Sequence, residues 1–341
     1  MLFLTNRVLR QSKRFKANRR VTFDLSDNSA EQSVYFLERT VGPDGPEYRE
    51  LGSRAWFEAL RNRPARQVLL YVHGYSNLPE EHVFPRAARL QKAFDQGEPG
   101  LVEVVPVVWP CDNDLGLIKD YYDDQKAADA SGIAFGRALE KFLAWRSATD
   151  PCPKRLNVLA HSMGNRVLRE AVYAWAKYER GGRVPLLFRN LFLVAADVVN
   201  ETLEPGRKGH WLTVAARNVC VYYASDDLAL RASKVANLVN DVASRRLGHT
   251  GPEDLERTPR NVYAIDCDDV NTRYDPPTGH TYFLYDGRGE EPEHRGQVFL
   301  HVFRCVATGR VPVNRGRREY VIGEGRGTVL DVERDAQMVP R

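Results

Sequence analysis

Apolar and polar positions show two different patterns of spacing along the chain from about residue 67 onward. Short apolar runs such as QVLLYV (67–72) are typical of strands buried on both faces, and longer segments such as 130–145 repeat their apolar residues at helical spacing. Because strands alternate with helices, the pattern predicts an α/β fold with a mostly parallel central sheet and helices on both faces. The expected strands are 67–74, 102–109, 156–162, 190–197, 218–227 and 261–266, and the expected helices are 80–94, 130–145, 163–178, 228–246 and 295–309.

The two ends of the chain do not show this alternation of strands and helices. Segments 20–26 and 33–40 predict antiparallel edge strands that lead into the sheet. The first twenty residues hold seven Lys or Arg and no acid, and we expect a solvated strand and loop there rather than a basic arm for phosphate or lipid. The expected organisation is one domain over 1–310, with a core at about 67–309 and edge strands at about 21–40, followed by a C-terminal extension at 311–341.

The composition is that of an ordinary globular protein, 43% hydrophobic and 28% charged over 341 residues. A net charge of +4 is too small to indicate a nucleic-acid partner. No apolar run approaches the roughly 18 residues of a membrane span, so we expect no stable membrane insertion. The cysteines have no CxxC or zinc-ligand spacing, which favours reduced thiols, a cytoplasmic protein and no bound metal. They are Cys111, Cys152, Cys220, Cys267 and Cys305.

A strand is predicted to run into a helix through Ala160-His161-Ser162-Met163-Gly164. A serine on a sharp strand-to-helix turn needs small residues two places before and after it, and the usual pattern is G-x-S-x-G. Alanine in place of the first glycine still meets this steric need. The start of the helix also places positive potential beside the hydroxyl. We therefore expect Ser162 to be a catalytic nucleophile.

A nucleophilic serine needs backbone donors for the oxyanion of its tetrahedral intermediate. One donor is expected to be the N–H of Met163, the residue after the nucleophile. The second is expected from the loop after the 67–74 strand, where the sequence reads YVHGYSN. Tyr75 N–H is the candidate, with His73 and Gly74 shaping the turn.

The acid that orients the catalytic histidine is expected after a later strand. The run 218–227 ends in Asp226 and Asp227, at the strand end where open α/β sheets place their ligand sites. One carboxylate would hold the histidine while the other caps the next helix. Asp197, one strand earlier, is a rival because some hydrolases take their acid there.

The catalytic histidine is expected last in chain order. His249 precedes the last predicted strand, His301 falls within a predicted helix, and His294 lies in the polar stretch GEEPEHRG. His280, in PPTGHTYF, follows the last strand and is the candidate base. The pocket beside it is expected to be lined by His73, Trp109, His161 and Tyr121. Tyr121 lies within 109–129, an aspartate-rich stretch that is expected to be either a lid or rim that repels anionic substrates or a solvated loop and helix start.

These pieces together resemble an α/β-hydrolase. More narrowly, the chain is similar to a bacterial α/β-hydrolase family of unknown function whose members are described as esterase-like or lipase-like. The matching motifs are VLLYVHGYSN, VVWP, LNVLAHSMGNRVL, LFLVAADV, YYASDDLALRAS and GHTYF, within roughly 67–285. The match departs at WPCDND, where a small residue is expected after Trp-Pro, so the resemblance implies a mechanism rather than a substrate.

By this resemblance Ser162 is the nucleophile and His280 the base. Asp227 is the acid, because the family's aspartate stands two residues before an Ala-Leu pair, here Ala229-Leu230. The implied function is a serine hydrolase that cleaves a small-molecule carboxylic ester without a cofactor. A lipase, thioesterase or acyltransferase with the same triad, or a non-catalytic binding scaffold, are the alternatives.

Overall fold

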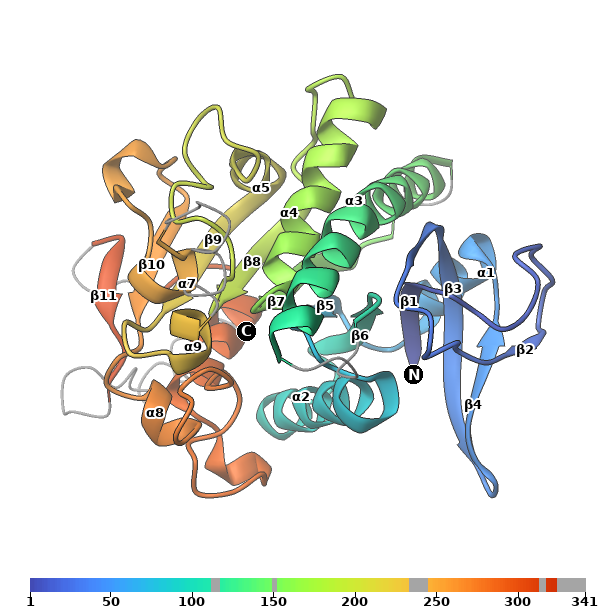
Figure 1. Cartoon of the computed structure of the whole chain (residues 1–341), viewed down its shortest axis with the longest axis horizontal. Helices are drawn as coiled ribbons and strands as arrows, with labels where there is room; N and C mark the ends of the chain where they lie inside the picture. Colours follow the sequence, from blue (N-terminus) through green and yellow to red (C-terminus); the bar gives the residue numbers. More distant parts are fainter. Residues whose placement is uncertain (112–116, 149–151, 233–244, 313–316, 324–341) are drawn as a thin grey trace.

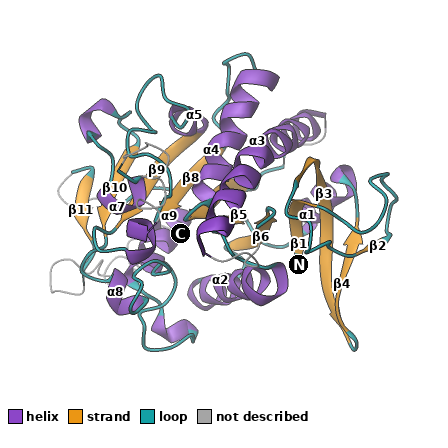
Figure 2. Ribbon diagram, in the orientation of Figure 1, coloured by secondary structure: helices purple, strands orange, loops and turns teal. Residues whose placement is uncertain are grey.

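The computed structural model describes residues 1–111, 117–148, 152–232, 245–312 and 317–323. Over these residues, eleven strands form one sheet that runs through the molecule (Figures 1 and 2). The strands are β1 (Leu2–Arg7), β2 (Arg20–Val21), β3 (Ala30–Gly42), β4 (Gly45–Glu50), β5 (Gln67–Val72), β6 (Val102–Val108), β7 (Arg155–His161), β8 (Phe188–Val194), β9 (Ala216–Tyr223), β10 (Val262–Asp266) and β11 (Glu319–Val321). Their order in the sheet is β11-β10-β9-β8-β7-β5-β6-β1-β3-β4-β2.

The sheet is parallel from β11 through β1, and this part contains all six strands expected from the sequence between 67 and 266. Side chains alternate between its two faces, as β5 shows. Val68 and Val72 belong to the apolar cluster on one face, and Leu69 and Tyr71 belong to the cluster on the other. The predicted α/β fold with a mostly parallel, two-sided sheet is therefore confirmed.

Helices cover both faces of this sheet, as predicted. The α-helices are α1 (Ser53–Asn62), α2 (Phe84–Gly97), α3 (Leu117–Ala148), α4 (Gly164–Ala174), α5 (His210–Ala215), α7 (Leu247–Thr250), α8 (Asn271–Tyr274) and α9 (Gln297–Thr308). Buried residues of α1, α3, α4 and α5 join the cluster on one face, and those of α2 and α9 join the cluster on the other. Figure 1 shows α3 and α4 side by side across the strands. Most of the helix expected at 228–246 lies outside the described residues.

The first strand corrects the expectation of a solvated N-terminal segment. All six residues of β1 are buried. The strand lies between β6, to which it is parallel, and β3, to which it is antiparallel. Thr5 Oγ1 also donates to the carbonyl of Val108 at 2.7 Å. The burial follows from the apolar run LFL, whose side chains pack on both faces of the sheet. The basic residues of this segment lie mainly after the strand.

Antiparallel strands flank β1, as the sequence predicted, although with different bounds. β3 covers the expected 33–40 segment and forms a hairpin with β4, which the sequence interpretation did not include. The expected 20–26 strand is reduced to β2, which pairs with β4 at the edge of the sheet. At the opposite edge β11 pairs with β10, so part of the expected C-terminal extension belongs to the sheet.

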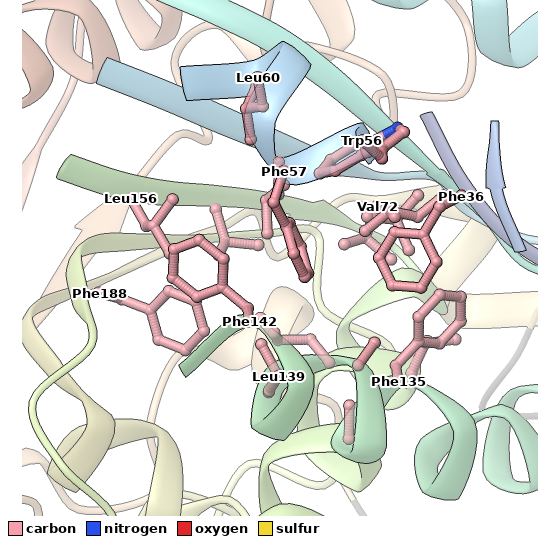
Figure 3. Close-up of a pocket in the computed structure, with 18 residues that line it drawn as sticks. Phe36, Trp56, Phe57, Leu60, Val72, Phe135, Leu139, Phe142, Leu156 and Phe188 are labelled. Atoms are coloured by element: carbon pink, nitrogen blue, oxygen red, sulfur yellow. The ribbon is translucent and has the colours of Figure 1, made fainter. Parts of the chain in front are cut away.

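An apolar cavity of about 80 Å³ lies between the sheet and the helices α1, α3 and α4 (Figure 3). Its wall consists of aliphatic and aromatic side chains, and the aromatic ones include Phe36, Phe57, Phe135, Phe142 and Phe188. Ser162, Asp227 and His280 are not among its lining residues. Across the described ranges, no helix is long and apolar enough to cross a membrane.

Candidate active site

Ser162 occupies a strained turn between β7 and α4. Its φ is 54°, in the left-handed region that few residues other than glycine adopt. The neighbours two places away are small for a steric reason. Ala160 is fully buried, and a Cβ added at Gly164 would lie 2.4 Å from the carbonyl oxygen of His73 and 2.6 Å from that of Val72. The turn therefore presses the start of α4 against the end of β5 and holds the hydroxyl at the carboxyl edge of the sheet.

Hydrogen bonds from Asn165 hold this turn together. Its side-chain amide donates to the carbonyls of Ala160 (3.0 Å), Ser162 (3.0 Å) and Val194 (3.2 Å). The backbone N–H of Ser162 donates to the same Val194 carbonyl at 3.0 Å. One buried amide thus ties the nucleophile's turn to the neighbouring strand β8.

The structure brings His280 and Asp227 into direct contact. His280 Nδ1 donates to Asp227 Oδ2 at 2.7 Å, and the Asp227 side chain is fully buried. The other carboxylate oxygen of Asp227 accepts the backbone N–H of Leu230 at 3.0 Å, so the same aspartate also caps the helical turn that follows. With Nδ1 committed to Asp227, Nε2 of His280 remains available for proton transfer.

The His280 loop is held from two further sides. Asp275 Oδ2 accepts the backbone N–H groups of His280 (2.8 Å) and Thr281 (2.7 Å). The carbonyl of His280 accepts a hydrogen bond from His161 Nε2 at 3.1 Å. His161 directly precedes Ser162, so this bond ties the histidine loop to the nucleophile's own strand. Ser162 Oγ and His280 form no direct hydrogen bond within the described part of the chain, and such bonds often tighten only when substrate binds.

Charge and burial act in opposite directions on the pKa of the His280 imidazole. Burial lowers the pKa of His280, but the carboxylate of Asp227 raises it more through its charge and its hydrogen bond, with Asp197 and Asp275 adding to the effect. The pKa of His280 therefore lies above the ordinary value of 6.5.

The two rival aspartates have other partners. Asp226 accepts a hydrogen bond from Asn271 Nδ2 at 2.5 Å. Asp197 accepts the hydroxyl of Tyr121 at 2.8 Å and forms an ion pair with Arg246 at 3.1 Å. The hydrogen bond from His280 to a carboxylate thus goes to Asp227.

The loop after β5 carries the second expected oxyanion donor. Ser76 in this loop has a φ of 56°, and its N–H donates to the buried carboxylate of Asp124 at 3.0 Å. Asn77 Nδ2 donates to the carbonyl of Tyr75 at 2.6 Å. A Cβ added at Gly74 would lie 3.0 Å from Ser162 Cβ, so this loop touches the nucleophile. On the other side, Met163 begins α4, where backbone N–H groups lack partners within the helix.

His73 and Trp109 were expected to line the substrate pocket, and the structure gives them another role. Both are fully buried, and their rings stack with centroids 5.2 Å apart. His73 Nδ1 donates to the carbonyl of Gly74 at 2.8 Å, and Nε2 accepts the N–H of Trp109 at 3.2 Å. Burial lowers the pKa of His73 to about 3, so the ring is neutral. The pair shapes the loop that bears Tyr75 from beneath and has no surface left for a substrate.

His161 and Tyr121, also expected in the pocket, are nearly fully buried as well. The ring of His161 lies 4.8 Å from that of His280, and its Nδ1 has no hydrogen-bond partner among the described residues. Burial lowers the pKa of His161 well below 6.5. Tyr121 packs edge-on against Tyr75 at 5.8 Å. Both side chains contact the candidate catalytic machinery directly.

A comparison with known families adds to this geometry. Residues 50–287 match the profile of the family described as "Alpha/beta hydrolase of unknown function (DUF900)". The chain belongs to this family. The α/β-hydrolase resemblance inferred from the motifs is therefore confirmed.

Two other searches add little to this α/β hydrolase. A search of curated proteins gives no match. Among solved structures, "Phospholipase PlaB from Legionella pneumophila in complex with thio-NAD" is similar at 14% identity with a TM-score of 0.26, over 61% of this chain and 40% of that one. The hydrolase thus spans less than half the length of that phospholipase, and a likeness at this level carries no information about its substrate.

Three residues of the hydrolase's site were missed from the sequence. Asn165 and Asp275 act on the backbone of the turns that carry Ser162 and His280, and these contacts follow from the folded turns rather than from the apolar pattern of the sequence. Asp124 was within the stretch read as a loop and helix start, but α3 already begins at Leu117 and carries this carboxylate to the loop after β5. Asn165 was the one of the three with a signal in the sequence, because it follows Met-Gly in the turn after Ser162. A buried amide at that position is surrounded by backbone carbonyls to which it can donate.

Proposed function

We propose that this α/β hydrolase is a serine hydrolase that cleaves a carboxylic ester through an acyl-enzyme on Ser162. The observation that carries the proposal is the buried 2.7 Å hydrogen bond from His280 to Asp227, at the same edge of the sheet as the strained turn of Ser162. An isolated serine in a tight turn would need neither an imidazole nor a carboxylate beside it.

In the proposed reaction, His280 Nε2 takes the proton of Ser162 Oγ as that oxygen forms a bond to the ester carbonyl carbon. The carbonyl oxygen becomes an oxyanion, which the N–H groups of Tyr75 and Met163 stabilise. Collapse of the intermediate breaks the bond to the alcohol oxygen, which receives the proton from His280. Water then repeats the sequence on the acyl-enzyme, releases the acid and restores Ser162.

The surrounding residues support this assignment of roles. Asp227 keeps the proton of His280 on Nδ1 and stabilises the imidazolium that forms during the reaction. His161 and His73 stay neutral because burial lowers their pKa values, so neither competes for the proton. The substrate we propose is a small-molecule acyl ester, with no cofactor. The five cysteines are buried thiols that form no disulfide among the described residues, which fits a reducing compartment such as the cytoplasm.

A fluorescent fluorophosphonate tests the proposal, because it labels only a serine that a neighbouring base activates. Wild-type protein should be labelled, and Ser162→Ala and His280→Ala should each abolish labelling. Ser147→Ala, which removes an exposed hydroxyl from α3, is the matched control and should be labelled like wild type.

Two results would contradict the proposal. Labelling that persists in Ser162→Ala would assign the nucleophile to another residue. A folded wild type that remains unlabelled would favour a non-catalytic binding scaffold. If labelling follows the expectation, oxygen esters and thioesters of equal acyl length, tested with and without an acceptor alcohol, distinguish an esterase or lipase from a thioesterase or acyltransferase.

A further inference from the structure

Arg86 is a partly buried cation that forms no ion pair with an acidic side chain in the part of the chain that the structure describes. It lies on α2, and its Nη1 donates to Asn77 Oδ1 at 3.1 Å and more weakly to the hydroxyl of Tyr71 at 3.5 Å. Both partners are neutral. Among the described residues, no carboxylate lies within ion-pair distance of its guanidinium. Buried charges are costly and are normally paired, so an unpaired guanidinium is an unusual feature.

The nearest acids are engaged elsewhere. Asp275 and Glu290 raise the pKa of Arg86 through their charges, together with the larger effect of Tyr71. Asp275 Oδ2, however, accepts the N–H groups of His280 and Thr281. Glu290 forms its ion pair with Arg89 on the outer side of the same helix. The carboxylates of Asp275 and Glu290 thus act on Arg86 from a distance, and neither forms an ion pair with its guanidinium.

The guanidinium also has donors to spare. Arginine has five N–H donors in a planar fork that matches carboxylate and phosphate oxygens. Nη1 of Arg86 makes the two contacts already described, and Nε and Nη2 have no partner among the described residues. Neither Nε nor Nη2 is fully enclosed by the protein, so both remain open to a ligand.

The position of Arg86 places this charge beside the proposed site. Asn77, which it contacts, donates to the carbonyl of Tyr75 in the oxyanion loop. From Tyr71 a series of ring contacts leads through Phe283 (6.3 Å) to His161 (5.1 Å), which packs on His280. Arg86 also contributes to the lowered pKa values of His161 and His73, after the larger effect of burial.

We infer that Arg86 binds an anionic group of the substrate, a carboxylate or a phosphate, close to the scissile ester. This inference rests on the proposed function and narrows its substrate class to acyl esters that carry a negative charge. The anion would supply the pairing that the chain itself does not provide. It would also be held by a planar fork rather than a point charge, which fixes its orientation.

Two pairs of esters matched in shape test the inference. Mono-4-nitrophenyl glutarate against 4-nitrophenyl pentanoate places a carboxylate on the acyl side, and 4-acetoxybenzoate against 4-acetoxybenzamide places it on the alcohol side. Wild type should prefer the anionic member of at least one pair by about ten-fold or more in kcat/KM, the effect of one charge-assisted hydrogen bond. Arg86→Gln should lose that preference, and Arg86→Lys should restore part of it.

Arg89→Gln is the matched control, because Arg89 lies three residues further along α2 and points to Glu290 at the surface. It should keep the wild-type preference. If Arg86 only supported the Asn77 loop, Arg86→Gln would lower both members of a pair alike and leave their ratio unchanged, which would overturn the inference. A wild type without preference in either pair would overturn it as well.

The fluorophosphonate experiment separates this inference from the proposed function. Labelled Ser162 without a preference for anionic esters leaves the proposed function standing and removes the role of Arg86. If the preference is found, the same ratio measured with a phosphonate in place of the favoured carboxylate identifies which anion the site is built for.

Discussion

Three buried imidazoles around Ser162 differ in the charge that they can hold. His280 has a raised pKa because the carboxylate of Asp227 outweighs the effect of burial. His161 and His73 have lowered pKa values because burial acts on them without an acidic partner. Of these three imidazoles, His280 is therefore the one suited to the proton transfer proposed above. The neutral neighbours position it and the oxyanion loop without adding positive charge.

The pH dependence of labelling should report the coupling of His280 to Asp227. Neutral His280 is the active form, so the labelling rate should rise with pH through a midpoint above 6.5. Asp227→Asn removes the charge that raises this pKa but leaves the burial that lowers it, so the midpoint should fall. The maximum rate should drop by roughly a hundred-fold or more, because the histidine tautomer is no longer held. Fluorophosphonate labelling rates between pH 5 and 9 measure both effects.

The adjacent carboxylate is the control for this experiment. Asp226→Asn changes a group that accepts from Asn271 and does not touch His280. Its midpoint should stay at the wild-type value. A midpoint that moves in Asp226→Asn and not in Asp227→Asn would reverse the assignment of the acid.

The sequence was informative about residues whose role follows from chain order. Ser162, Asp227 and His280 were chosen because each follows a predicted strand, and the structure joins two of them by a hydrogen bond. His73 and Trp109 also lie in the expected place, but their side chains stack on each other and are buried. Asp275 and Arg86 were not predicted, because the role of Asp275 depends on the folded His280 loop and that of Arg86 on the lack of an acidic partner among the described residues. Asn165 had only its place after Met-Gly as a signal.

At the scale of elements, the strand-to-helix turn depends on Gly164. Its added Cβ would collide with two backbone carbonyls at the end of β5, and backbone cannot move aside as a side chain can. Any displacement would shift β5 against α4. Tyr75 lies in the loop after β5 and Met163 directly precedes α4, so the spacing of their N–H groups depends on this contact.

Gly164→Ala should therefore abolish fluorophosphonate labelling and lower the free energy of unfolding by about 1–3 kcal/mol, the usual cost of overpacking. Chemical denaturation gives the stability, and labelling gives the state of the site. Gly42→Ala is the control, since an added Cβ there meets nothing closer than 3.8 Å and its backbone is not in the left-handed region. A Gly164→Ala protein that is labelled normally would contradict the close contact between α4 and β5.

Element boundaries were less predictable than element order. α3 runs from Leu117 to Ala148, whereas apolar spacing indicated only 130–145. The earlier turns are rich in aspartate and read as a loop, but Asp124 and Tyr121 are paired with groups of other segments. Tertiary hydrogen bonds thus extend the helix beyond the part that its apolar pattern explains. β4 was missed because its sequence GPEYRE has no alternation of apolar and polar residues, and β1 was expected as a solvated strand although it is buried.

At the scale of the whole molecule, the apolar cavity beneath α3 and α4 is a packing defect on one face of the sheet. Unfilled space of about 80 Å³ costs about 2 kcal/mol at the usual penalty per unit volume. Part of that stability should be recoverable by a larger side chain that points into the space.

Ala138→Val should raise the free energy of unfolding by about 0.5–1 kcal/mol, because Ala138 lines the cavity and two methyl groups fit within it. Ala134→Val, one turn earlier on α3, is the matched control. Ala134 is buried in the same cluster but does not line the cavity, so the same added groups should destabilise the fold. Urea unfolding of both variants measures the difference, and an equal loss in both would show that the space is not available.

The place of β1 has a consequence for synthesis on the ribosome. Thr5 pairs with Val108 across 103 positions of sequence, so the first strand cannot be seated until β6 has been made. At ordinary translation speeds of about 5–20 residues per second, this leaves the apolar LFL segment waiting for roughly 5–20 seconds. Until β6 is made, the edge of β1 that will face it stays unpaired, although the opposite edge can already pair with β3. Slow codons between β1 and β6 would lengthen the time for which β1 is exposed. A chaperone that binds newly made apolar strands would reduce the risk of aggregation during that time.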